Sequence, residues 1–283
     1  MTEAGDHCEK LVRELDKDRF LATLFAPATL RPALFALYAF NVEIGRVRDV
    51  AHEPMPGEIR LQWWREVVEG GREGEAAAHP VAAAVLEATE RHGPAREMLV
   101  DLIDAHAFDL YSDPMPSLTH AEAYASKTAA TLFRLAAKIV HGTDAATEQL
   151  ALHAGAAYEF TGWLKQFPRH AARHQLYVPG DILQRYGAAE EDIFAGKTTS
   201  ELRAALAEFR LHIRGHLTAS GDLIAAVTPA TLPAFLPLAL VRPRLKKMEK
   251  PGYDAFAEAD VPQWRRQWAL WRAARNPRAM AKR

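Results

Sequence analysis

The sequence predicts an all-α protein that folds as a single domain, and three observations support this fold class. Apolar residues recur with the period of an α-helix, sequences typical of β-hairpins are scarce, and no internal repeat is present. Clusters of Pro and Gly divide the chain into helical runs at residues 53–57, 70–74, 93–94, 113–116, 142–144, 179–180 and 187. No linker between these runs is long enough to require a second domain.

Local patterns predict where several helices begin and how one of them packs. The segment Tyr124–Val140 is expected to form one helix, whose many small side chains allow either close helix packing or a cavity. Predicted helix starts are the capping boxes of Thr119 with Glu122 and of Thr198 with Glu201, and Asp260 before Val261-Pro262.

The composition is that of a globular protein with an uneven charge distribution. Hydrophobic residues make up 49% of the 283 residues and charged residues 25%, and the net charge of −1 argues against a nucleic-acid partner. Residues 242–283 contain 12 Lys and Arg against 4 Asp and Glu, a local charge of +8, so the rest of the chain carries −9. This asymmetry predicts an acidic partner or an anionic membrane surface for the C-terminal segment.

The cysteine content and the N-terminal segment predict a cytoplasmic protein. Cys8 is the only cysteine, so no internal disulfide can form. The chain contains no run of 18 apolar residues, so we expect no membrane-spanning helix. The first 18 residues are rich in acids and lack an apolar core, which argues against a signal or transit peptide.

The C-terminal segment 256–283 is expected to form a basic helix that follows a helical domain of residues 1–255. Trp264, Trp268 and Trp271 fall on one face of this helix, and arginines lie largely around the rest of it. Two interpretations remain open. The tryptophans pack against the helical domain, or they contact the surface of an anionic membrane.

Two segments carry the most informative motifs. The first is Ala36–Asp49 and contains Tyr38-Ala39-Phe40, and the second is Gly155–Pro179. Together with Arg60-Leu61-Gln62-Trp63-Trp64, they resemble the squalene/phytoene synthase family over roughly residues 15–255. The resemblance implies an isoprenoid-synthase-like helical bundle with a central cavity. In that family, an aspartate-rich motif on each of two helices holds magnesium against a prenyl diphosphate.

The aspartates of both motifs are largely replaced in this sequence. The first motif's leading pair falls on Gly45 and Arg46, so only Asp49 remains, and the second motif's pair falls on Gln166 and His170. Magnesium prefers carboxylate, water and phosphate oxygens. We therefore expect no catalytic residue, no metal site and no cofactor, and magnesium is expected only if the chain is an enzyme after all. Pro168 is expected to interrupt the second helix.

The same two segments supply the candidate ligand-binding residues. Basic side chains there either bind a diphosphate through charge-assisted hydrogen bonds or form a solvated face. For Glu43, a salt bridge to Arg46 within the helix is the alternative to a role in the cavity. The candidates for the cavity and its basic mouth are Tyr38, Glu43, Arg46, Asp49, Glu159, Trp163, Lys165, Gln166, Arg169 and Arg173.

One branch of the superfamily combines this skeleton with altered motifs, and it includes the mitochondrial assembly factor for respiratory complex I. Phe40-Asn41-Val42-Glu43 and Gln62-Trp63-Trp64 are similar to that branch. The resemblance implies a non-catalytic factor in the biogenesis of NADH dehydrogenase, peripheral at the inner membrane face. Its expected partners are complex I subunits, a prenyl diphosphate or lipid-like ligand, and an anionic membrane surface. The alternatives are an active transferase that condenses two prenyl diphosphates and a lipid carrier.

Overall fold

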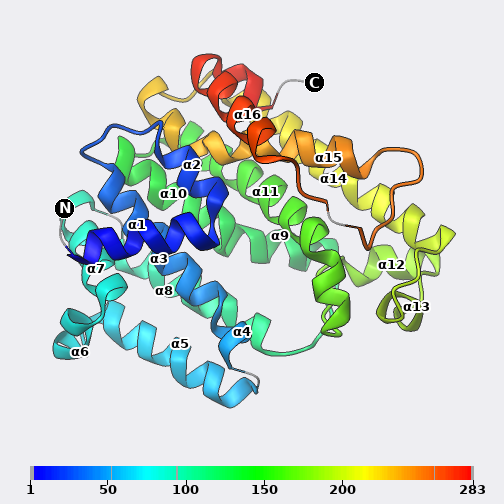
Figure 1. Cartoon of the computed structure of the whole chain (residues 1–283), viewed down its shortest axis with the longest axis horizontal. Helices are drawn as coiled ribbons and strands as arrows, with labels where there is room; N and C mark the ends of the chain where they lie inside the picture. The colour runs from blue at the N-terminus through cyan, green and yellow to red at the C-terminus, as the bar shows by residue number, and fades with distance from the viewer. Residues whose placement is uncertain (1–2, 52, 94, 258, 282–283) are drawn as a thin grey trace. The chain divides into compact units, whose positions relative to one another are not determined.

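A computed structural model describes residues 3–51, 53–93, 95–257 and 259–281. Every regular element in these ranges is a helix, which confirms the predicted all-α class (Figure 1). The chain forms two compact units. The first consists of Met1–Tyr111, Thr131–Ala151 and Ala226–Pro237, and the second of Ser112–Ala130, Leu152–Ala225 and Leu238–Arg283.

The first unit is built around a helix that is apolar on almost all sides. This helix is α3 (Arg31–Gly45), and it packs against α1 and α7. Burial of ten of its residues supplies much of the core of this unit. The other helices in this part of the chain are α1 (Glu3–Leu15), α2 (Lys17–Thr23), α4 (Val47–Val50), α5 (Pro54–Glu69), α6 (Glu73–Ala78), α7 (Pro80–His92), α8 (Arg96–Ala105) and η1 (His106–Leu110).

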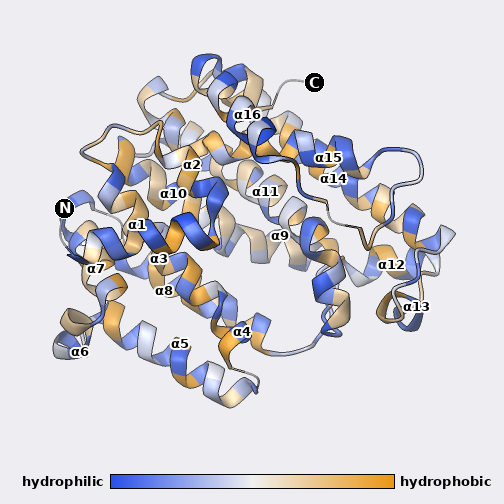
Figure 2. Cartoon of the chain, in the orientation of Figure 1, coloured by the Kyte–Doolittle hydropathy of each residue, from blue (hydrophilic) through white to orange (hydrophobic). Residues whose placement is uncertain are grey.

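Helix α5 packs against α8 and η1 within the same unit. Its first turn contains two prolines, which need no N–H partner at a helix start. Gly57 allows the close approach to η1, because a Cβ there would lie 2.5 Å from Cδ2 of Leu110. Gly70 ends the helix with a φ of +91°, a conformation that favours glycine. Figure 2 shows hydrophilic and hydrophobic residues alternating along α5, as expected for a helix with one exposed face.

The second unit contains most of the later helices, and α10 and α11 contribute residues to both units. Gly155 of α11 lies against the start of α10, since a Cβ on it would be 2.5 Å from the Ala130 backbone. Helix α12 packs against α14 and α9. The elements after residue 111 are α9 (Leu118–Lys127), α10 (Ala129–Val140), α11 (Ala145–Ala172), α12 (Gly180–Tyr186), α13 (Glu190–Phe194), α14 (Ser200–Leu223), η2 (Pro229–Leu240), α15 (Val241–Met248), α16 (Gln263–Arg275) and η3 (Pro277–Met280).

The prediction of one helix over Tyr124–Val140 was wrong, because the chain breaks at Thr128 between α9 and α10. The backbone N–H and the hydroxyl of Thr128 both donate to the Tyr124 carbonyl, at 3.0 and 2.8 Å. The ψ of Thr128 is −92°, outside the helical range. A threonine side chain that bonds to the preceding turn competes with helix continuation.

The prediction that Pro168 interrupts the second motif helix was also wrong, because α11 continues through it to Ala172. Pro168 removes one helix hydrogen bond. Its neighbours Phe167 and Ala171 are buried, and Phe167 packs on Phe256 with ring centroids 5.3 Å apart. This packing holds the helix in place on both sides of the proline.

The predicted helix starts lie within two or three residues of the observed ones. Ser117, rather than Thr119, caps α9 by accepting from the His120 N–H. Thr199, rather than Thr198, caps α14. Asp260 does not cap α16, which begins at Gln263. Neighbouring hydroxyl residues compete for each cap, and the sequence alone does not distinguish them.

Candidate functional site

The first motif lies on α3 and α4 in the first unit. Tyr38 is buried, and the Arg19 guanidinium carbon lies 5.7 Å from its ring centroid. Burial raises the pKa of Tyr38, so its phenol stays neutral at physiological pH. Asp49, the one remaining motif aspartate, is half-buried on α4.

The motif position that has lost its acid still has room for one. Gly45 is exposed, and a Cβ there would meet only Cε1 of His106, at 4.0 Å. Packing therefore does not explain why position 45 lacks an aspartate. Arg46 follows it as an exposed cation, which repels a divalent metal. Within the described ranges, no group of three or more His, Cys, Asp or Glu residues is placed to hold a metal ion.

The second motif lies on α11, where aromatic packing is the main feature of the second unit. Trp163 is buried and stacks on Tyr177 with centroids 5.2 Å apart, and it also contacts Tyr124 at 5.6 Å. The ring of His170 lies 4.6 Å from that of Tyr177. The residue in place of the second aspartate is therefore part of this aromatic cluster. Glu159 is half-buried on the same helix, and Gln166 is exposed.

The basic residues of the second motif differ in their surroundings. The Lys165 Nζ lies 3.7 Å from Oδ2 of Asp260, a carboxylate that also pairs with Arg244 at 3.1 Å and with Arg266 at 3.5 Å. Burial alone would raise the pKa of Asp260, but Arg244 and Lys165 hold it below its usual value. Arg169 and Arg173 are exposed. Lys165 thus has a carboxylate partner within its own unit, which reduces the charge it offers to a ligand.

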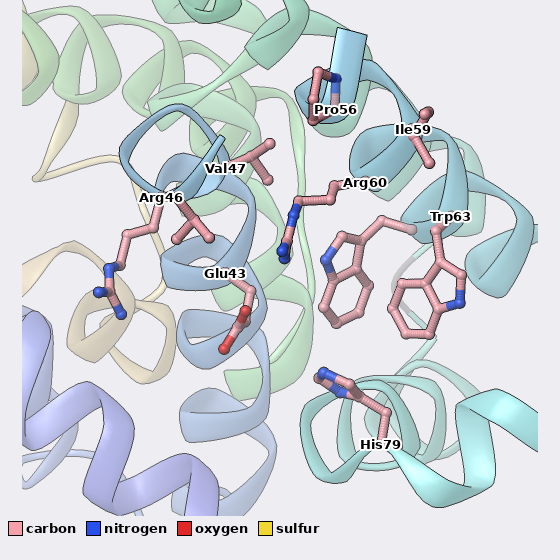
Figure 3. Close-up of a pocket in the computed structure, with 10 residues that line it drawn as sticks. Glu43, Arg46, Val47, Pro56, Ile59, Arg60, Trp63 and His79 are labelled. Atoms are coloured by element: carbon pink, nitrogen blue, oxygen red, sulfur yellow. The ribbon is translucent and has the colours of Figure 1, made fainter. Parts of the chain in front are cut away.

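Two further candidates, Glu43 and Arg46, line a cavity of about 550 Å³ between α3–α4, α5 and the start of α7 (Figure 3). The expected salt bridge between them is absent: of the residues that the structure describes, none makes an ion pair with Glu43 within 4.0 Å. Figure 3 shows Glu43, Arg60 and His79 converging on the cavity from three different elements. The full lining is Glu43, Arg46, Val47, Val50, Pro56, Ile59, Arg60, Trp63, Trp64 and His79.

Trp63, Trp64 and His79 form one wall of this cavity. The two indole rings meet at 79° with centroids 5.0 Å apart, and His79 lies 5.3 and 5.2 Å from them. Trp63 is fixed by its indole N–H, which donates to Glu75 at 2.6 Å. The sequence placed Trp63 and Trp64 in a family motif but did not predict a site there. Residues 43, 46–47 and 50, one helical turn apart, were the available signal for a common face.

His79 presents one ring nitrogen to the protein and leaves the other available. Its Nδ1 accepts from the Ala82 N–H at 3.3 Å and so caps α7, which places the proton of the neutral ring on Nε2. Burial lowers the pKa of His79, although the nearby Glu43 carboxylate opposes this effect. The imidazole is therefore neutral at pH 7.

The tryptophans of α16 are exposed, which excludes the interpretation that they pack in the core. The exposed fractions are 63% for Trp264, 58% for Trp268 and 38% for Trp271, and Trp268 stacks on Trp271. Together with Gln267 they line an open groove of about 530 Å³. Arg265 and Arg275 lie over the rings of Trp264 and Trp271, at 5.0 and 4.2 Å from the centroids. None of the described helices is long and apolar enough to cross a membrane.

Comparison with known proteins identifies the family. The model of the squalene/phytoene synthase family matches residues 12–272. The chain belongs to the squalene/phytoene synthase family. The match covers both motif segments and extends into α16, so the resemblance seen in the motif residues holds for most of the chain.

Curated relatives come from both branches of this family. The chain is 29% identical over 252 residues to the human NADH dehydrogenase (ubiquinone) complex I, assembly factor 6, covering 89% of this chain and 76% of that protein. The rat protein of the same name is 28% identical over 250 residues, covering 88% and 75%. The 15-cis-phytoene synthase of Synechococcus elongatus is 24% identical over 286 residues, covering 95% and 92%.

Solved structures confirm the isoprenoid-synthase-like fold. A dehydrosqualene synthase crystallised with a ligand matches with a TM-score of 0.84 at 16% identity, covering 98% of this chain and 97% of that chain. At this identity the likeness establishes the fold and not the activity.

Proposed function

We propose that this protein is a non-catalytic factor in the biogenesis of respiratory complex I. The observation that carries the proposal is the replacement of motif acids by Gly45, Arg46, Gln166 and His170 in a chain that is 28–29% identical to complex I assembly factor 6 over most of its length. A Cβ at position 45 would meet only Cε1 of His106, at 4.0 Å, so close packing does not account for the glycine there.

The retained skeleton of the motifs supports a binding role without chemistry. Trp163 packs with Phe160 and Tyr177 in a buried aromatic cluster, an apolar environment of the kind that a prenyl or other lipid-like chain requires. Arg169 and Arg173 supply exposed cations for its phosphate. In this proposal the protein holds such a ligand while it assists assembly, and neither magnesium nor another cofactor takes part.

The C-terminal helix supports a location at the inner membrane face, on the cytoplasmic side. An exposed tryptophan face bordered by arginines fits the interface of an anionic bilayer, where indole rings and guanidinium groups are both favoured. This surface would hold the protein at the membrane in which the complex is assembled.

A gene deletion distinguishes the assembly role from the enzymatic alternative. In the host organism, we expect deletion to lower the amount of assembled NADH dehydrogenase on native gels and to leave squalene and phytoene levels unchanged. A Trp163→Ala version of the gene should restore assembly less well than the wild type. Loss of these isoprenoid products with intact NADH dehydrogenase would instead favour the active prenyl transferase.

Vesicle binding tests the membrane location separately. The variant with Trp264, Trp268 and Trp271 replaced by alanine should lose binding to phosphatidylglycerol vesicles, while its melting temperature changes little because the side chains are exposed. Leu211→Ala removes an equally exposed apolar side chain from α14 and serves as the control. Wild-type binding should weaken with added salt. If the wild type ignores the vesicles, the membrane location is rejected.

A further inference from the structure

The cavity beside α5 contains opposite charges that no protein contact satisfies. Glu43 carries a carboxylate, and Arg46 and Arg60 carry guanidinium groups. Among the residues that the structure describes, none of the three has a hydrogen-bond or ion-pair partner. Charged side chains that line a cavity without pairing with each other are available to an incoming ligand. Their mixed signs favour a ligand that itself carries both charges.

The aromatic wall beside Glu43 is suited to the positive end of such a ligand. Trp63 and Trp64 meet nearly at right angles and form a corner, and the His79 ring lies against both indole rings. An ammonium group is attracted to the faces of indole rings, most strongly when a carboxylate lies nearby. Because burial keeps His79 neutral at pH 7, the imidazole does not repel this cation.

The rim of the cavity is apolar and suited to hydrocarbon. Val50 and Ile59 line it and are 49% and 65% exposed, and Met55, four residues before Ile59 in the first two turns of α5, is 70% exposed. Large apolar side chains gathered at one exposed site indicate a contact with an apolar partner. In Figure 3, Arg60 lies between Ile59 of this rim and Glu43.

We propose that this cavity binds a zwitterionic phosphoalkylammonium group, with the ammonium in the Trp63–Trp64 corner beside Glu43 and the phosphate on Arg60. Arg46 lines the same cavity and adds positive charge to it. The group is the head of phosphatidylcholine and phosphatidylethanolamine, and it also occurs in free phosphocholine and phosphoethanolamine. Glu43, Val47 and Val50 line the cavity from a face of α3–α4 other than the one carrying positions 45 and 49. Arg46, the other position of the leading aspartate pair, also lines it, so the site borders the family's diphosphate motif. It is also independent of the proposed role in complex I biogenesis.

The test compares soluble probes by titration calorimetry on the full-length protein. Phosphocholine should bind at least about tenfold more tightly than inorganic phosphate or tetramethylammonium, each of which carries only one of the two charges. Dihexanoyl-phosphatidylcholine, used below its micelle concentration, distinguishes the two sources: tighter binding than phosphocholine indicates a lipid, and equal binding indicates the free head group. If phosphate alone binds as tightly as phosphocholine, or if no probe binds, the proposal is overturned.

Variants assign the two ends of the ligand. Glu43→Gln should weaken phosphocholine binding about tenfold and leave phosphate binding unchanged or tighter, because it removes a negative charge. Arg60→Gln with Arg46→Gln should weaken both probes. Glu97→Gln and Arg13→Gln, at exposed positions of the same unit outside the cavity, are the matched controls. Tighter phosphocholine binding by Glu43→Gln would show that the site takes a simple anion, and the proposal would be wrong. If Glu43→Gln does not fold, Trp63→Leu at a partly exposed position tests the ammonium end instead: it should weaken phosphocholine binding and leave phosphate binding unchanged.

Discussion

The two motif helices differ from the family's aspartate motifs in different ways. On α3, the acid at position 45 has been replaced by a glycine with open space around it, and Asp49 remains nearby on α4. On α11, the replaced positions are Gln166 and His170, and His170 packs on Tyr177 in an aromatic cluster. Lys165, one residue before Gln166, is tied to Asp260. The first motif lost a side chain, whereas the second acquired new structural contacts.

This difference indicates that the second motif helix is more strongly constrained by structural contacts than the first. A vacant position can be refilled by one substitution without disturbing its neighbours. A position whose side chain has joined a packed cluster cannot be changed without a cost in stability. The predictions below therefore place the large effects on stability at packed positions near the second motif, and the small ones at open or exposed positions of either motif.

The largest loss of stability is expected from a substitution at Asp260. Its carboxylate pairs with Lys165 of the second motif and with Arg244 and Arg266. Asp260→Ala removes a carboxylate that pairs with Arg244, a residue that is only 3% exposed. Breaking a buried pair from one side typically costs about 3 kcal/mol or more in the free energy of unfolding. Chemical denaturation measures this loss. Asp192→Ala breaks the exposed pair with Lys197 and should cost less than about 1 kcal/mol. Equal losses in the two variants would show that Asp260 contributes no more to stability than the carboxylate of an exposed ion pair.

The same carboxylate predicts a pH dependence. Because the pKa of folded Asp260 is held below its usual value, its contribution is fully present above about pH 4, the value for an unfolded aspartate. The contribution is lost as the pH falls through the lower pKa of the folded state. The stability difference between wild type and Asp260→Ala should therefore be constant from about pH 5 to 7 and shrink below about pH 4. A difference that grows on acidification would contradict this assignment.

The same substitution at two glycines compares the packing around the two motif segments directly. A Cβ on Gly155 would lie 2.5 Å from the Ala130 backbone, so Gly155→Ala should lower the free energy of unfolding by about 2 kcal/mol. A Cβ on Gly45 has its nearest contact at 4.0 Å, so Gly45→Ala should leave stability unchanged or raise it by up to about 1 kcal/mol. Thermal unfolding of the pair is the measurement. A destabilised Gly45→Ala would mean that the first motif is as tightly packed as the second.

The smallest effect on stability is expected from replacing the exposed arginines of the second motif. Replacing Arg169 and Arg173 by glutamate should change the free energy of unfolding by less than about 1 kcal/mol. The same variant should lose binding of a prenyl phosphate, because it exchanges attraction for repulsion. Arg203→Glu with Arg185→Glu, on other helices of the same unit, controls for total charge. Unchanged ligand binding would show that Arg169 and Arg173 do not bind the ligand and only form a solvated surface.

Much of the fold could be predicted from the sequence, because its signals are local. Helical periodicity predicted the all-α class, and the Pro and Gly clusters predicted several of the helix boundaries, since each signal depends on a few neighbouring residues. The errors occurred where a distant or competing contact decided the outcome. Burial of Phe167 against Phe256 carries α11 through Pro168, and the bond from Thr128 to Tyr124 divides a segment with good helical propensity.

The sites were less predictable, because their contacts join residues far apart in the chain. Lys165 meets Asp260 from a position 95 residues earlier, and His79 meets Glu43 across α5 and α6. Neither contact has a local sequence signal. The i, i+3 spacing suggested a pair between Glu43 and Arg46, but spacing alone does not set rotamers, and both side chains instead line the cavity.

The central claim, that magnesium-dependent prenyl transfer has been lost, is tested most directly by one assay on the purified protein. Diphosphate release is measured with farnesyl or geranylgeranyl diphosphate in the presence and absence of magnesium. The replacement of acids at Gly45, Gln166 and His170 predicts no release above the rate without protein, with or without the metal. Magnesium-dependent turnover on the order of 1 per second, the range of ordinary enzymes, would contradict the claim and restore the transferase alternative.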